Sequence, residues 1–289
     1  MTPPRVARPR PAGVVTMLTD FGLNDGYVGA VKGAILSAWP SARLVDITHL
    51  VPPLDVHHGA YVLGTASGAF PSGTVHLAVV DPGVGTSRRG LVVSTRGHLF
   101  VGPDNGLMTY VLWPDLVRRR HHVPLLAPMT TRLPGDARAY VLDRPEFWRQ
   151  GVSPTFHARD IFGPVAAHLA SGVPPESVGS SASEVTALYV PRPAWSGHSL
   201  HGVVLHVDRF GNLMTNIAGK SLEKRWVDIE VGGRRVRGLV GTYGDAAGLA
   251  AMISSNRFLE IAITNGNAGR ELGVGVGETV VVRPARRLA

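Results

Sequence analysis

The chain has 289 residues, 44% of them hydrophobic, with no cysteine and a formal net charge of +8. A chain of this length can bury a large core and is expected to form two domains. The lack of cysteine excludes disulfides, thiolate nucleophiles and cysteine-ligated metals. No apolar run approaches the length of a membrane span, and no apolar signal core opens the chain, so we expect a soluble, cytoplasmic protein.

The positive charge raises the question of nucleic-acid binding. Arginines gather near both ends of the chain and in one internal run, Arg118-Arg119-Arg120-His121-His122. No aromatic residues are interleaved with them, unlike the platforms of proteins that bind single strands. A solvated basic surface is therefore the favoured interpretation, and nucleic-acid binding through the arginine clusters is the alternative.

The first half of the chain alternates between strand and helix patterns. Residues 1–12 are rich in Pro and Arg and are expected to be a disordered basic tail. Apolar runs of strand character follow at 14–18, 44–48, 74–79, 91–94 and 99–101. Apolar residues at helical spacing occupy 27–39, 56–70 and 161–171. This alternation predicts an α/β domain over residues 13–175 with a mainly parallel central sheet, interrupted by an irregular stretch at about 113–137.

The second half has a different pattern. Residues 176–200 are rich in Pro and Ser and are predicted to be a linker. Short β-type runs separated by glycine turns then lie at 202–207, 227–231, 235–239, 258–263 and 279–282. They predict an all-β domain over residues 201–289, a small barrel or sandwich.

The run Val80-Asp81-Pro82-Gly83-Val84-Gly85-Thr86-Ser87-Arg88 is the strongest candidate for chemistry. Its proline and glycines exclude a helix and force an exposed turn after a buried strand. Asp81 and Arg88 would then lie at the carboxyl end of a core strand, where open α/β sheets bind ligands. The alternative is a surface turn with two solvated charges.

Other candidates lie in loops next to helices. Asp20 and Asp25 lie between a strand and a helix, where they either cap the helix or bind a ligand that has several hydroxyls or an ammonium group. His157 lies in a loop that leads into a helix, where capping or a surface position is the alternative to catalysis. Arg159 and Asp160 are interpreted as an exposed local pair that contributes little to stability.

Several of these motifs form an ordered set. They are Thr19-Asp20-Phe21-Gly22 with Asp25, Asp81-Pro82-Gly83-Val84-Gly85 with Arg88, Pro103-Asp104-Asn105-Gly106, Phe156-His157-Ala158-Arg159-Asp160, Asp208 with Phe210-Gly211-Asn212, and Ser254-Ser255. In this order and spacing the chain, from about residue 14 to 284, resembles the S-adenosyl-L-methionine (SAM) hydroxide adenosyltransferases. These SAM hydrolases are related to the fluorinase and chlorinase enzymes.

The resemblance implies an N-terminal α/β domain, a C-terminal β-barrel and a homotrimer with active sites at subunit interfaces. It implies hydrolysis of SAM to adenosine and L-methionine, with water or hydroxide attacking the ribose C5′ in line with the sulfur. SAM is then the substrate, and no cofactor, metal, membrane or specific nucleic acid is expected.

By the same resemblance, Asp81, Arg88 and His157 would be catalytic, and either Asp81 or His157 would take the proton. Asp20 would hold the ribose hydroxyls, Asp25 and Asp208 the methionine ammonium, and Ser255 its carboxylate. Phe210 and Tyr243 would flank the adenine or ribose, and Asn212 would bind the purine edge. The remaining predicted substrate-binding residues are Asn105 and Asn265.

Two alternatives stay open. A halide-using adenosyltransferase would carry a tyrosine at Asp81 and a halide-binding serine at Ala158, and this chain departs from both. A non-catalytic protein that binds SAM or adenosine would need the same substrate contacts without turnover.

Overall fold

The computed structural model describes residues 10–113, 123–222 and 227–285. The chain divides into two compact units, one of residues 10–113 and 126–189 and the other of residues 123–125, 190–222 and 227–285. The run from Arg118 to His122 and residues 1–9 of the predicted tail lie outside the described part. At the end of that tail, the Ala12 amide donates to the Gly73 carbonyl at 3.1 Å, so this residue belongs to the folded first unit.

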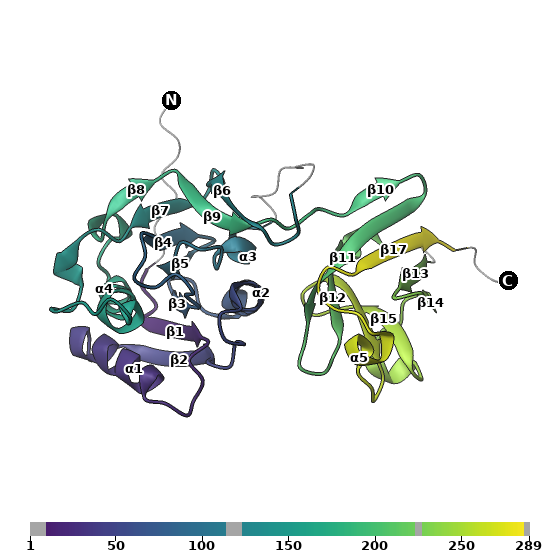
Figure 1. The fold of residues 1–289 in the computed structure, drawn as a ribbon, viewed down its shortest axis with the longest axis horizontal. Coiled ribbons are helices and arrows are strands. Elements are labelled where there is room, and N and C mark those ends of the chain that lie inside the picture. The colour runs from purple at the N-terminus through teal and green to yellow at the C-terminus, as the bar shows by residue number, and fades with distance from the viewer. Residues whose placement is uncertain (1–9, 114–122, 223–226, 286–289) are drawn as a thin grey trace. The chain divides into compact units, whose positions relative to one another are not determined.

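The first unit is built on a seven-stranded sheet (Figure 1). In spatial order its strands are β2 (Arg43–Thr48), β1 (Val14–Thr19), β3 (Val75–Val79), β5 (His98–Pro103), β4 (Gly90–Thr95), β7 (Arg138–Val141) and β8 (Ser180–Ala182). The first four run parallel, and β4, β7 and β8 extend the sheet in antiparallel pairings. The predicted α/β domain with a mainly parallel sheet is confirmed.

Helices cover both faces of this sheet. On one face α1 (Tyr27–Ala38) and α4 (Gly163–Ser171) pack against each other, and Val15 and Met17 of β1 join their core. On the other face lie α2 (Val56–Ala66) and α3 (Thr109–Leu112), and Gly59 of α2 allows close approach of Val80 and Leu107. Because β1 and β3 run parallel, the loops that follow them leave the same edge of the sheet. No described helix is long and apolar enough to cross a bilayer.

The segment predicted as a linker, residues 176–200, contains regular structure. It forms β8, β9 (Glu184–Leu188) and β10 (Ala194–Ser196). Strand β9 pairs with β6 (Pro128–Arg132), which lies in the stretch interpreted as irregular. The Pro and Ser content hid these strands, because each is short, and β8 and β9 depend on pairing with distant partners. The first unit ends at Tyr189 instead of residue 175.

The second unit is an antiparallel β-structure. Its main strand order is β14 (Arg234–Arg237), β13 (Val227–Val231), β17 (Thr279–Pro284), β11 (Ser199–Val207), β12 (Leu213–Ala218), β16 (Phe258–Ile263) and β15 (Leu249–Ile253), with β10 added on β11. The end strands β14 and β15 contact each other, so the sheet curls into a nearly closed barrel around buried aliphatic side chains. The short helix α5 (Ala268–Leu272) packs beside β16. The predicted all-β barrel is confirmed.

Candidate active site

The turn that follows β3 presents Asp81 and Arg88. Every residue of β3 is buried, and Val80 is fully buried, so Asp81 emerges directly from the core. The turn then folds on itself, with the Val84 amide donating to the Asp81 carbonyl at 3.3 Å. Gly85 has φ of +78°, and a Cβ there would lie 2.6 Å from the Pro154 carbonyl oxygen. A glycine at this position therefore lets the turn pack against the loop that carries His157.

Arg88 connects the three predicted catalytic side chains. Its Nε donates to Asp81 Oδ1 at 2.9 Å, and its Nη2 donates to Asp81 Oδ2. The same Nη2 lies 2.9 Å from His157 Nδ1. Only 12% of the Arg88 side chain and 6% of the Asp81 side chain are exposed, so the alternative of two solvated charges is wrong. Within the described part of the chain, no hydrogen bond is made by Nη1 of Arg88.

The geometry fixes the state of His157. Burial and the neighbouring Arg88 charge lower its pKa, while Asp81 and Asp160 act in the opposite direction. The ring is therefore neutral at pH 7. Because a guanidinium only donates, Nδ1 is the acceptor and the ring proton is on Nε2.

A π-helical turn, Ala158–Phe162, follows His157 directly and leads into α4. Such turns are rare and are often found at functional sites. Its last residue, Phe162, is fully buried and lies under the Arg88 guanidinium, 5.2 Å from Cζ to the ring centroid. The turn thus fixes the histidine at one end and supports the arginine at the other.

The carboxylate of Asp160 anchors this loop. It accepts from the Ser153 amide at 2.9 Å and from Arg159 Nε and Nη2 at 2.7 and 2.8 Å. Asp160 is completely buried, so the interpretation of this pair as exposed is wrong. Arg159 also lies over the ring of Phe156, 5.0 Å from the centroid.

Asp20 and Asp25 follow β1 at the same sheet edge as Asp81. Asp20 Oδ2 accepts from the Leu54 amide at 2.8 Å, and Leu54 has a left-handed φ of +64°. Asp25 is exposed in the turn before α1. The N-terminus of α1 is at Gly26 and has no side-chain cap, which excludes the capping interpretation for both aspartates.

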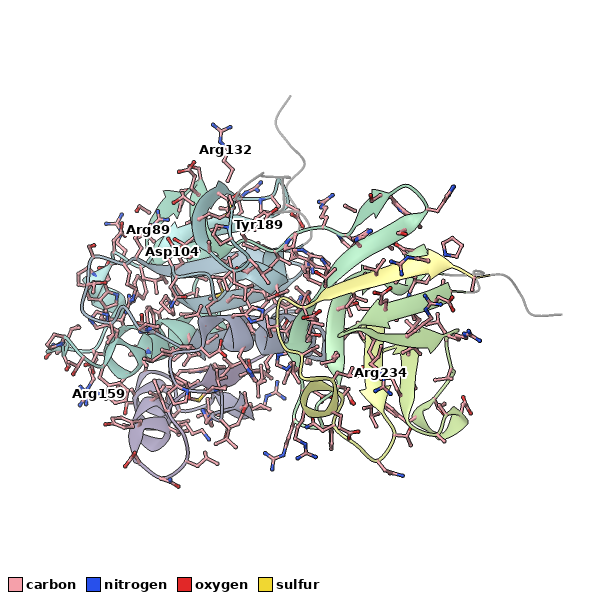
Figure 2. All side chains as sticks on the ribbon, turned by 45° about the vertical axis from the view of Figure 1, so that its right-hand side comes forward. Arg89, Asp104, Arg132, Arg159, Tyr189 and Arg234 are labelled. Atoms are coloured by element: carbon pink, nitrogen blue, oxygen red, sulfur yellow. The ribbon has the colours of Figure 1, made fainter. Side chains whose placement is uncertain are left out.

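Both ends of the Asn105 side-chain amide are hydrogen-bonded to backbone groups. Its Nδ2 donates to the Val80 carbonyl at 2.8 Å, and its Oδ1 accepts from the Leu107 amide at 3.1 Å. The amide therefore fixes the end of β3 from which Asp81 emerges. Next to it, Asp104 is bound by Arg89, and Figure 2 shows this pair in the first unit.

In the second unit the predicted residues Asp208 and Asn212 form one turn. Asp208 Oδ1 accepts from the Phe210 and Asn212 amides at 2.8 and 2.9 Å, and Oδ2 accepts from Asn212 Nδ2 at 3.2 Å. The Phe210 ring at the tip of this turn is 74% exposed. Ser255 and Asn265 lie exposed on separate turns, and Asn265 has a φ of +58°.

Tyr243 leads to a residue that the sequence interpretation missed. Its hydroxyl donates to Glu260 Oε1 at 2.5 Å, and Glu260 is 3% exposed. The signal in the sequence is a lone glutamate inside the apolar strand Phe258–Ile263. Among the described residues, no cluster of three or more His, Asp or Glu could hold a metal ion.

Fold and site define a two-unit protein with an α/β domain, a β-barrel, and an Asp–Arg–His cluster at the carboxyl end of its central sheet. Residues 15–179 match the model of the SAM hydroxide adenosyltransferase N-terminal domain, and residues 202–281 match that of the C-terminal domain. The chain belongs to the SAM hydroxide adenosyltransferase family.

Individual relatives are similar over nearly the whole chain. The (R)-S-adenosyl-L-methionine hydrolase of Thermus thermophilus is 40% identical over 92% of this chain and 98% of its own length. The protein of the same name from Salinispora tropica is 37% identical over 94% and 98%. Among solved structures, an uncharacterized conserved protein from Thermotoga maritima superposes with a TM-score of 0.81 at 36% identity, covering 93% of this chain and 99% of that one.

Proposed function

We propose that this protein is an enzyme that hydrolyses SAM to adenosine and L-methionine. The observation that carries the proposal is the partly buried cluster of Asp81, Arg88 and His157, linked by hydrogen bonds at the carboxyl edge of the sheet. Near full-length similarity to proteins named SAM hydrolases supports the same activity.

The reaction needs little more than an oriented water molecule. The sulfonium of SAM leaves as a neutral thioether, so it requires no protonation and no metal. A water placed opposite the sulfur attacks C5′, the C5′–O bond forms, and the C5′–S bond breaks with its electron pair going to sulfur. Arg88 Nη1 is the donor in the cluster that can hold this water, while Asp81 and Phe162 keep the guanidinium in place.

The attacking oxygen loses one proton as it becomes the 5′-hydroxyl of adenosine. Since that oxygen turns into a protonated alcohol, which is a strong acid, even an ion-paired carboxylate can accept the proton. Asp81 retains unused lone pairs on both oxygens, whereas His157 Nδ1 is occupied by Arg88. We therefore assign the proton to Asp81 and give neutral His157 the role of fixing Arg88.

The substrate contacts are proposed from the family resemblance. Asp20 would bind the ribose hydroxyls, and its attachment to the Leu54 amide supports a fixed carboxylate there. Asp25 and Asp208 would bind the ammonium, Ser255 the carboxylate, and Phe210, Asn212 and Tyr243 the adenosine part. Asn265 would be a further substrate contact. Asn105 has both ends of its amide engaged, which supports a positioning role instead of substrate contact.

The proposal includes a homotrimer whose active sites join residues of neighbouring subunits, and the cytoplasm as its location. Analytical ultracentrifugation tests the first point. A monomer at micromolar concentration with full activity would contradict it.

Product analysis tests the activity. Purified protein is incubated with SAM, with and without chloride, and the products are separated and identified by mass. Adenosine and methionine in equal amounts are expected under both conditions. 5′-Chloro-5′-deoxyadenosine as the main product would establish a halide-using enzyme, and tight SAM binding with no methionine released over hours would establish a non-catalytic binding protein.

A further inference from the structure

Glu260 is a buried carboxylate that the proposed chemistry does not use. It lies in the middle of β16, with Leu259 and Ile261 on either side facing the aliphatic core of the barrel. Because side chains alternate along a strand, Glu260 points to the opposite face. Its paired neighbours across the sheet are Met214 and Met252. Burying the Glu260 carboxylate costs desolvation free energy, and an apolar residue at this position of the strand would not carry that cost.

The carboxylate of Glu260 fixes Tyr243. The phenol hydroxyl donates to Oε1 at 2.5 Å, and at the other end the Tyr243 carbonyl accepts from Thr264 Oγ1 at 3.0 Å. The short 3₁₀ turn Tyr243–Asp245 is closed by a reciprocal cap between Thr242 and Asp245. Even so, Tyr243 remains 46% exposed. An aromatic side chain that is fixed at its hydroxyl and anchored at its backbone, but open to solvent, is preorganised to receive a flat ligand.

The pKa shifts of the two groups determine that Tyr243 is the donor and Glu260 the acceptor in this hydrogen bond. Burial and the charge of Asp208 raise the pKa of Glu260, while the phenol hydrogen bond opposes them. The bond to Glu260, with burial and the charges of Glu260 and Asp208, raises the pKa of Tyr243 to about 12. The hydroxyl is therefore a donor to Glu260 at any physiological pH. The influence of Asp208 on both groups also places its turn close to this pair.

We propose that Glu260 is a positioning residue of the substrate site, which acts by holding the Tyr243 ring against the adenosine part of the ligand. This rests on the proposed function, since it takes adenosine as the group that meets the ring. Glu260 does not contact the reacting atoms, so its effect should appear in ligand affinity more than in the chemical step.

Adenosine binding, measured by calorimetry, tests this without requiring turnover. Glu260→Leu removes the acceptor and Tyr243→Phe removes the donor. Each should weaken adenosine binding by ~2- to 10-fold, because a Tyr243 ring that is no longer held must be ordered when the ligand binds. The double variant should bind as weakly as either single variant and no weaker, because both changes remove the same contact. Glu260→Gln retains an acceptor oxygen and should restore most of the affinity.

Glu230→Gln is the matched control. Glu230 lies on β13 of the same barrel and pairs with Arg283, so the substitution makes the same change in charge on the surface. Its adenosine affinity should equal that of the unmodified protein. Thermal unfolding of every variant checks folding, and if Glu260→Leu does not fold, Tyr243→Phe and Glu260→Gln still test the same bond.

The outcomes separate the two proposals. If the unmodified protein binds no adenosine, the role of Glu260 falls, and product analysis with SAM decides the proposed function separately. If it binds adenosine and the folded variants bind equally well, or if the losses in the double variant simply add, the role of Glu260 is wrong and the proposed function stands.

Discussion

Replacing Arg88 by lysine separates the charge of this residue from its geometry. Arg88 uses two nitrogens to make three hydrogen bonds, two to Asp81 and one to His157. A lysine ammonium retains the positive charge but concentrates its donors on one atom. It cannot reach both carboxylate oxygens and the imidazole in one plane, and it has nothing equivalent to Nη1 for the water.

The expected loss is in kcat. Losing the donor that orients the attacking water misplaces the nucleophile relative to C5′, which lowers the rate by ~100-fold. Because the proposed substrate contacts lie on other residues, the KM for SAM should change by no more than about 3-fold, which is the pattern for an interaction made mainly in the transition state. Steady-state release of methionine measures both parameters, and calorimetry with adenosine checks that the product still binds.

Arg89→Lys is the matched control. Arg89 is the next residue in the chain and also binds a carboxylate, with Nε and Nη2 at 2.9 and 2.5 Å from Asp104 Oδ2. Its side chain is 40% exposed, and it lies outside the cluster that includes His157. Its kcat should stay within about 3-fold of the unmodified protein, because lysine retains the charge beside Asp104 and the contacts of Arg89 are to Asp104 and the Glu184 carbonyl. If Arg88→Lys has the same kcat as Arg89→Lys, the fork geometry has no part in catalysis and the proposed role of Arg88 is wrong.

Three further predictions follow from the same structure. Asp81→Ala and His157→Ala should each lower turnover by ~100-fold or more while adenosine binding persists, and near-normal rates in these variants and in Arg88→Ala would refute the assigned roles. Asn105→Ala frees the carbonyl before Asp81 and should lower kcat with little change in KM; a rise in KM alone would instead indicate direct substrate contact. His76 is fully buried, and burial, together with the neighbouring His98, lowers its pKa to about 3. The fold accommodates the neutral form of His76, so above the unfolded pKa near 6.5 this residue costs no stability. As the pH falls from 6.5 toward 3, the free energy of unfolding decreases by about 1.4 kcal/mol per pH unit. Urea unfolding at pH 7 and pH 5 should show this loss, and His76→Gln should reduce it; an unchanged slope would exclude His76 as its source.

Local sequence signals were sufficient for most of the first unit. The helix at 27–39 was predicted from apolar spacing and a following proline, and the structure has α1 at Tyr27–Ala38. The turn after β3 was predicted from Pro82 and the two glycines, which restrict the backbone whatever surrounds them. Such signals fail for a short strand that forms only because it pairs with another strand. Strand β8 is three residues long and extends β7, and nothing in its serine-rich sequence indicates that pairing.

Local sequence signals also failed to reveal that the carboxylates of Asp160 and Glu260 are buried. Asp160 is next to Arg159, and an adjacent pair of opposite charges usually lies on a surface. Its burial results from the π-helical turn and from the Ser153 amide, and neither has a sequence signature. Glu260 was missed for a related reason, because a strand pattern shows which face a residue takes but not that Tyr243, 17 positions away, supplies its hydrogen bond.

The contact between Arg88 and His157 spans 69 residues, and its cause is steric as well as electrostatic. The charge-assisted hydrogen bond from Nη2 to the neutral Nδ1 stabilises this contact, but it does not by itself bring together two segments so far apart in the chain. The geometry comes from packing: Gly85 lets the turn approach the Pro154 carbonyl, and Phe162 supports the guanidinium from below. With the loop held by Asp160 and the arginine by Asp81, the imidazole Nδ1 meets Nη2 and keeps its proton on the opposite nitrogen. The cluster is then the ion pair of Asp81 and Arg88 beside the neutral ring of His157, and it has no net charge. Such an arrangement can orient a water molecule through directed hydrogen bonds, without an excess charge.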